Sequence, residues 1–416
     1  MSTAPEPART GQTDPDAARP GAPRNLTLAT LASVVGFWGW TVIAPLGTFY
    51  AKDMGLNAAQ TGLLVAMPVL VGSLGRIAVG VLTDRFGGRR LLTWILFATA
   101  PVVVLVALAG SLKSFALMLL FGFFLGVGGT VFTAGIPFSA AWYPASRQGF
   151  ATGIFGMGMG GTALSAFLTP RLVGWIGYWP THIAIAVLLV VTGLVVHFAM
   201  RESPTWRPAG AGTFGKLVRA AKLPVTWQLC FLYAVVFGGF VSFSTYLPTY
   251  LRDIYDFNLT DAGTRTAGFA LAAVVARPIG GIIADRIGPK PVVAVALAGV
   301  AVLAFIVNLQ PSGEVATGAT FLAMAAALGL GTGGVFAWVG RRSPAGMVGA
   351  VTGVVSAAGG LGGYFPPLIM GATYNAAERS YAIGLLLLAG TAIVALVLTL
   401  LMARRQASAS PAGARA

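Results

Sequence analysis

Two arginines lie within apolar stretches of the sequence, where ionised side chains are rare. Arg76 lies in the segment VGSLGRIAVGVL, and Arg277 lies in AAVVARPIGGII. The guanidinium group stays protonated, and its planar fork of donors fits the geometry of oxyanions. An ionised arginine in the middle of a membrane costs at least about 2.5 kcal/mol. Two such side chains therefore need a partner that compensates their charge.

The acidic residues of the chain do not supply this partner. All twelve fall in a tail, a loop or the end of an apolar stretch. We therefore expect the two arginines to hold a small anion between them. The alternative is that carbonyl groups, hydroxyl groups and water satisfy the arginines without an anion site. The acidic residues are Glu6, Asp14, Asp16, Asp53, Asp84, Glu202, Asp253, Asp256, Asp261, Asp285, Glu314 and Glu378.

A polar loop follows each arginine at the same distance. Asp84 comes eight residues after Arg76, Asp285 comes eight residues after Arg277, and the two copies are offset by 201 residues. We expect each aspartate to hold loop basic residues across the interface of the two halves, which would stabilise one closed state. The alternative is that the basic residues only set the topology. These candidate gating residues are Arg85 and Arg89 in the first loop and Arg286 and Lys290 in the second.

The composition places the chain in a membrane. Of its 416 residues, 56% are hydrophobic and only 9% are charged, whereas a soluble domain has about 25% charged residues. The net charge of +15 does not indicate nucleic-acid binding, because the basic residues cluster in loops on one side of the predicted membrane. One cysteine and two widely separated histidines offer no metal cluster and no pair of nucleophile and base. We expect neither an enzyme nor a cofactor.

Hydropathy predicts an all-α membrane protein with twelve transmembrane helices in two pseudo-symmetric six-helix bundles. The domains are a disordered N-terminal tail (1–25), a first bundle (26–200), a cytoplasmic linker (201–223), a second bundle (224–403) and a C-terminal tail (404–416). The predicted spans are 28–50, 58–82, 91–110, 114–138, 148–168 and 179–200, then 226–250, 261–284, 291–309, 315–339, 346–372 and 380–403.

The distribution of lysine and arginine predicts the orientation. The side that carries both tails holds 19 basic residues and the other side holds six, with Arg76 and Arg277 in neither group. Basic residues are enriched on the cytoplasmic side of membrane proteins. Both termini are therefore expected in the cytoplasm, and the protein is expected to be integral to the plasma membrane.

The repeated loops resemble the loop signature of the major facilitator superfamily. In this chain they read Gly80-x3-Asp84-Arg85-x-Gly87-x-Arg89-Arg90 and Gly281-x3-Asp285-Arg286-x-Gly288-x-Lys290. The resemblance implies the major facilitator fold, with two six-helix halves and a substrate site between them near the middle of the membrane.

Within that superfamily the chain is similar to the nitrate/nitrite porters. The segments Gly128–Gly161 and Gly349–Pro366 resemble the two glycine-rich signatures of that family. The resemblance implies that Arg76, Arg277 and three aromatic residues contact the substrate. The chain departs from the family pattern at two positions. Met159 and Gly360 stand where the two signatures usually have an asparagine. We expect asparagines restored at both positions to raise the affinity for nitrate. The aromatic residues are Phe132, Tyr233 and Phe237.

These observations favour a secondary transporter of a small anion, with nitrate or nitrite as the first candidate, that works by alternating access and exchange. Proton coupling to another small oxyanion or an organic carboxylate is the alternative, with His182 and His197 as the histidine candidates. A non-transporting anion sensor is the alternative from another class. We expect a monomer that has the lipid bilayer and the anion as its partners.

Overall fold

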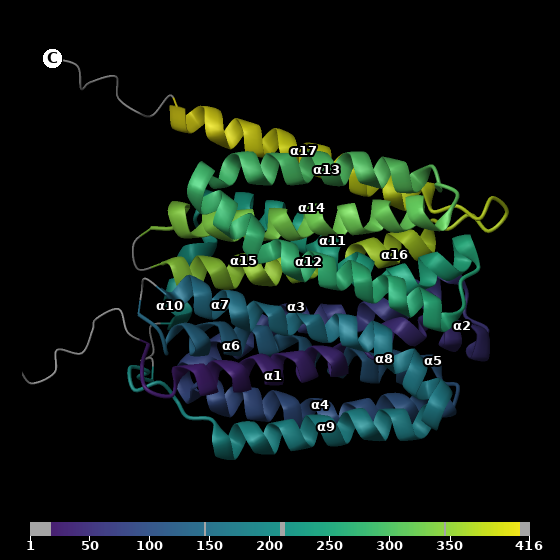
Figure 1. Cartoon of the computed structure of the whole chain (residues 1–416), viewed down its shortest axis with the longest axis horizontal. Helices are drawn as coiled ribbons and strands as arrows, with labels where there is room; N and C mark the ends of the chain where they lie inside the picture. Colours follow the sequence, from purple (N-terminus) through teal and green to yellow (C-terminus); the bar gives the residue numbers. More distant parts are fainter. Residues whose placement is uncertain (1–17, 145–146, 209–212, 345–346, 408–416) are drawn as a thin grey trace, which may run out of the picture.

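The computed structural model describes residues 18–144, 147–208, 213–344 and 347–407, and it is helical throughout the two bundles (Figure 1). The first bundle comprises α1 (Ala22–Trp40), η1 (Ala44–Leu46), α2 (Gly47–Met54), α3 (Ala58–Phe86), α4 (Gly88–Ser111), α5 (Phe115–Leu125), η2 (Gly126–Thr130), α6 (Val131–Ala140), α7 (Gln148–Gly156), η4 (Met157–Gly160), α8 (Gly161–Ile176) and α9 (Tyr178–Ala199). A short helix, α10 (Thr213–Ala221), follows in the linker.

The second bundle comprises α11 (Pro224–Tyr255), α12 (Leu259–Ile287), α13 (Pro289–Asn308), α14 (Glu314–Arg342), α15 (Val348–Gly362), α16 (Phe365–Ala372) and α17 (Ala382–Ala407). In Figure 1 the purple and blue helices of the first bundle lie below the green and yellow helices of the second. α1 begins and α17 ends at the same end of the molecule, and α10 lies at that end too. We call it the terminal end and the opposite one the outer end.

The predicted spans match these helices closely. Within the described residues, eleven segments are long and apolar enough to cross a membrane. The predicted span 346–372 is divided into α15 and α16, each of which is too short to cross alone. This arrangement agrees with the twelve-span architecture. α1 begins at Ala22, so the end of the predicted disordered tail is helical, and residues 1–17 and 408–416 lie outside the described part of the chain.

The internal repeat in the sequence corresponds to repeated local geometry. The side chain of Asn57 accepts a hydrogen bond from the backbone of Gln60 at the start of α3, and Asn258 accepts one from Asp261 at the start of α12. Such side-chain caps satisfy backbone donors that the helix cannot pair internally. At the other ends of these helices, Gly87 and Gly288 have φ angles of 89° and 93°, a backbone conformation that favours glycine.

Two of the helix interruptions place residues of the predicted site. The turn η2 precedes Phe132, and a Cβ at Gly126 would overlap with the backbone of α3. The turn η4 contains Met159, and a Cβ at Gly161 would overlap with the backbone of α1. The glycines therefore allow neighbouring helices to approach at the depth where the site residues lie.

The two bundles are in direct contact at the outer end. A Cβ at Gly62 of α3 would overlap with the carbonyl oxygen of Pro367 in α16, and one at Gly263 of α12 would overlap with that of Ala166 in α8. Toward the terminal end, by contrast, a Cβ at Gly153, Gly156 or Gly281 would have no neighbour within 4 Å. The close packing between bundles therefore extends from the outer end to Gly360 and Ser73 near the site, and the three glycine positions toward the terminal end are open.

A bulkier residue at Gly263 should open the outer end. The change Gly263→Val must push α12 away from α8, and overpacking of this kind costs about 1–3 kcal/mol. Thr249 is buried in α11 against Gly47 of the other bundle and can report on this opening. In a Cys230→Ala background, Thr249→Cys should react roughly tenfold faster with an impermeant maleimide when Gly263→Val is present.

The matched control is Gly268→Val on the same helix, where the nearest atom to an added Cβ is a leucine methyl at 3.9 Å. This change should leave the labelling rate unaltered. Equal rates for the Gly263→Val and Gly268→Val proteins would show that the outer contact does not hold the bundles together.

Candidate anion-binding site

The two predicted arginines lie together where the bundles meet. Arg76 comes from α3 of the first bundle and is only 2% exposed, whereas Arg277 comes from α12 of the second and is partly buried. The guanidinium carbon of Arg76 lies 5.9 Å from the ring centre of Phe132 and 5.4 Å from that of Phe237. That of Arg277 lies 5.1 Å and 5.7 Å from the same two rings. The two cations therefore share one pair of aromatic rings.

Arg76 is held by two backbone carbonyl groups. Its Nε donates to the oxygen of Gly72, one turn earlier in α3, at 2.9 Å. Its Nη1 donates to the oxygen of Ser356 in α15 of the second bundle at 3.0 Å. The side chain is thus oriented by its own helix and reaches across the junction to the opposite half.

Arg277 reaches across the junction in the reverse direction. Its Nη1 lies 3.0 Å from the sulfur of Met159 in the first bundle, and its Nη2 donates to the hydroxyl of Tyr233 at 3.2 Å. Tyr233 is fully buried and stacks on Phe237 with ring centres 4.8 Å apart. A thioether is a weak acceptor, so Met159 compensates little of the charge.

More than half of the N–H donors of the two arginines are not used by the described protein contacts. A guanidinium group has five N–H donors, and the described contacts use two from each arginine. No ion pair in the described part of the chain includes Arg76 or Arg277. Carbonyl, hydroxyl and thioether groups orient the arginines, but these neutral groups do not cancel two positive charges.

The space at the site is small. A cavity of about 10 Å³ lies beside Arg277, with Met159, Phe237 and Phe240 among its lining residues, whereas Arg76 does not line it. A cavity of this volume holds about one water molecule. An anion of three or four heavy atoms can bind only if a side chain moves. Met159 is the flexible candidate, because unbranched methionine adapts its shape easily.

The two positions that lack asparagine have different surroundings. Met159 is buried, and its side chain already lies against Arg277. Gly360 packs against Ser73 of α3, and a Cβ at this position would overlap with the Ser73 hydroxyl. A side chain at position 360 would therefore push α15 away from α3. An asparagine can be introduced without this displacement only at position 159.

The predicted gating loops lie at the terminal end and are not brought to the arginines. Within the described residues, neither Asp84 nor Asp285 forms an ion pair. Arg341 donates to the backbone oxygens of Ala284 and Asp285. The role of Asp84, Arg85, Arg89, Asp285, Arg286 and Lys290 as a latch between the halves remains a prediction.

Glu202 supports the first gating loop from the start of the linker. Its carboxylate accepts a hydrogen bond from the backbone N–H of Arg89 at 2.8 Å, at the beginning of α4. An anionic group at this position satisfies a free helix donor and is favoured by the helix dipole. Burial nevertheless raises the pKa of the Glu202 carboxyl above its ordinary value.

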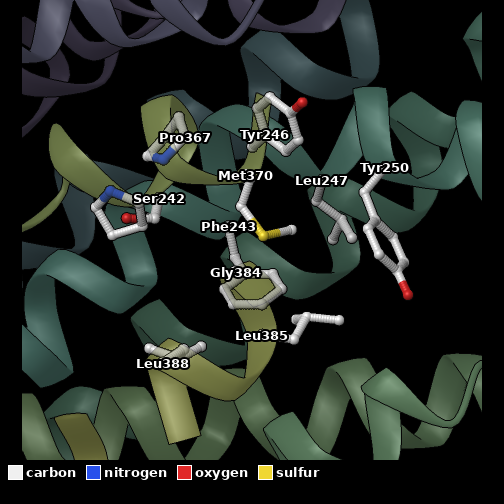
Figure 2. Close-up of a pocket in the computed structure, with 11 residues that line it drawn as sticks. Ser242, Phe243, Tyr246, Leu247, Tyr250, Pro367, Met370, Gly384, Leu385 and Leu388 are labelled. Atoms are coloured by element: carbon white, nitrogen blue, oxygen red, sulfur yellow. The ribbon is translucent and has the colours of Figure 1, made fainter. Parts of the chain in front are cut away.

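Two other buried features do not offer an anion site. His182 contacts the backbone oxygen of Tyr178 and the hydroxyl of Tyr50, and neither contact involves an arginine of the site. A cavity of about 30 Å³ lies among α11, α16 and α17, with mainly apolar side chains such as Phe243, Met370 and Leu388 around it (Figure 2). An ionised guest would lose its hydration there without gaining a charged partner.

The sequence reasoning missed three residues that the structure adds to the site. Phe336 of α14 lies 5.3 Å from the guanidinium carbon of Arg277, Ser356 accepts from Arg76, and Ser73 fills the space at Gly360. The repeat could have identified Phe336, because Gly-Gly-Thr-Val-Phe at 128–132 returns as Gly-Gly-Val-Phe at 333–336. Backbone acceptance by Ser356 leaves no signal in a sequence.

A helical membrane protein with two related six-span halves, and with cationic side chains where the halves meet, is a secondary transporter by architecture. The chain belongs to the major facilitator superfamily, whose family model matches residues 29–365 and 255–416. The fold also resembles that of a bacterial homologue of the human lysosomal transporter Spinster, with a TM-score of 0.71 at 19% identity over 93% of this chain and 98% of that one.

Sequence relatives confirm the resemblance to the nitrate/nitrite porters. The probable nitrate/nitrite transporter NarK2 of Mycobacterium tuberculosis is 57% identical over 388 residues, which cover 93% of this chain and 98% of that protein. The nitrite extrusion protein of Bacillus subtilis is 34% identical over 91% of this chain and 93% of its own length. The probable nitrate/nitrite antiporter NarK1 of Thermus thermophilus is 33% identical over 84% and 85%.

The contact between Met159 and Arg277 generates a test of anion selectivity. In the change Met159→Asn an amide replaces the thioether, shortens the side chain and adds donors beside Arg277. Nitrate affinity should rise about tenfold, because a hydrogen bond to a charged group contributes about 1.5–3 kcal/mol. Ligand-induced shifts of the thermal unfolding midpoint over a nitrate titration measure this effect.

Met159→Leu is the matched control, because it keeps the volume and removes only the sulfur. It should bind nitrate with the affinity of the parent protein. If the Asn and Leu variants bind equally tightly, the amide at position 159 does not contribute to recognition.

Proposed function

We propose that this protein exchanges nitrate and nitrite across the plasma membrane and binds each anion between Arg76 and Arg277. The observation that carries the proposal is the crossed arrangement of the two arginines. Each comes from one bundle and contacts the other bundle, and both share Phe132 and Phe237. An anion that enters here would gain donors from both halves at once.

The same arrangement supports an alternating-access cycle. Two like charges in a low-dielectric site repel each other, and the repulsion weakens when an anion lies between them. The loaded protein can then pass through the occluded state more easily than the empty one. This difference favours exchange of one anion for another over net transport of a single anion.

The contacts between the bundles support a state that is closed at the outer end. Positive charge is concentrated at the terminal end, which we assign to the cytoplasm, so this state would receive its anion from the cytoplasmic side. The names of two relatives, an antiporter and an extrusion protein, agree with exchange. We further propose that a single chain forms one complete transport unit.

The test is exchange in proteoliposomes that contain nitrite inside and labelled nitrate outside. Uptake should require internal nitrite and should not be driven by a pH gradient alone. Arg76→Lys and Arg277→Lys should each lower the exchange rate about 10- to 100-fold, because a lysine ammonium does not replace the fork of donors.

The matched control is Arg265→Lys on the same helix as Arg277, where the side chain pairs with Glu314 near the surface. It should exchange at the parent rate. Parent-like exchange by either site variant would reject the proposal. Substitution of cyanate, formate and small dicarboxylates for internal nitrite shows whether another anion is the better substrate.

A further inference from the structure

The linker helix α10 has two different faces. Ala220 is buried, and Leu217 lies against Gly353 of α15, so this face packs on the second bundle. Arg219 is exposed on the opposite face, Lys216 is exposed at the border between the two faces, and Lys222 is exposed directly after the helix. An amphipathic helix with basic residues on its polar face is typical of a segment that lies at a membrane surface.

The residues beside this helix fit the same position. Val218 of α10 is 40% exposed, and Trp227 in the first turn of α11 is 59% exposed. The indole N–H of Trp227 donates to the backbone oxygen of Ala221, the last residue of α10, at 2.7 Å. Tryptophan concentrates at the level of lipid headgroups, where its ring is apolar and its N–H finds a partner.

The basic side chains on this surface are not paired with acidic ones in the part of the chain that the structure describes. No ion pair within the described residues includes Lys216, Arg219 or Lys222. Glu202, the single acidic residue of the predicted linker 201–223, is bound to the backbone of Arg89 instead. A phospholipid with a net negative charge would complement the free cations, and its acyl chains would lie along Val218 and Trp227.

We propose that α10 and the first turn of α11 bind the headgroup of an anionic phospholipid in the leaflet at the terminal end, with Arg219 and Lys222 as its cationic ligands. This surface is separate from the arginine site and does not depend on which anion is transported. It lies at the junction of the bundles, because α10 contacts α3 as well as α15 and α11.

The experiment measures which lipid lies next to Trp227 in the full-length protein. The protein is reconstituted into phosphatidylcholine vesicles with a minor fraction of phosphatidylglycerol. In parallel samples, either the phosphatidylglycerol or an equal amount of phosphatidylcholine is brominated close to the headgroup. Bromine quenches nearby tryptophan, and the difference between the parent protein and Trp227→Phe isolates the signal of Trp227.

Brominated phosphatidylglycerol should quench Trp227 more strongly than the same amount of brominated phosphatidylcholine. The preference corresponds to about a fivefold local enrichment for each basic residue near the surface, and high salt should reduce it. The charge-removing variant Arg219→Gln/Lys222→Gln should lose the preference. The charge-conserving variant Arg219→Lys/Lys222→Arg should retain it.

Equal quenching by the two brominated lipids in the parent protein would overturn the proposal. A preference that survives in the charge-removing variant would overturn it as well. Nitrate exchange is not part of this readout, so a failure here would leave the anion site untouched.

Discussion

The structure depends on the cost of holding two guanidinium groups inside a membrane with no acidic partner in the described part of the chain. Each group carries a penalty of at least about 2.5 kcal/mol on insertion scales, and the two also repel each other. The aromatic rings of Phe132 and Phe237 offset part of this cost by cation–π attraction, worth about 0.5–2 kcal/mol for a contact. In the proposed function, the remaining cost is what a bound anion would offset.

The packing between the two bundles allows them to move relative to each other around the arginines. Glycines at the outer end and at the depth of the site let helix backbones approach without intervening side chains. These packing contacts hold the bundles together only while the helices stay close. Within the described part of the chain, no disulfide or ion pair joins one bundle to the other. A site that contacts both bundles can therefore change the relative stability of their arrangements, as alternating access requires.

Much of this architecture could be predicted from the sequence because lipid leaves few structural options. Long apolar segments must become helices, and the repeat placed Arg76 and Arg277 at equal depth. The family resemblance pointed to Tyr233 and Met159, which do contact Arg277. The contact of Arg76 with Ser356 could not be predicted, because Ser356 acts through its backbone. The division of the eleventh span at Gly363 and Tyr364 and the helical form of α10 were also missed. Short helices are stabilised by tertiary contacts more than by local sequence.

The central claim is that Arg76 and Arg277 bind one shared anion, and a double-mutant cycle of nitrate binding tests it most directly. Dissociation constants are measured for the parent protein, Arg76→Lys, Arg277→Lys and the double variant. If the anion lies between the two guanidinium groups, each single change removes most of the affinity and the double change weakens binding little further. If the two losses in binding free energy simply add, the arginines act independently, and the account of a shared site is wrong.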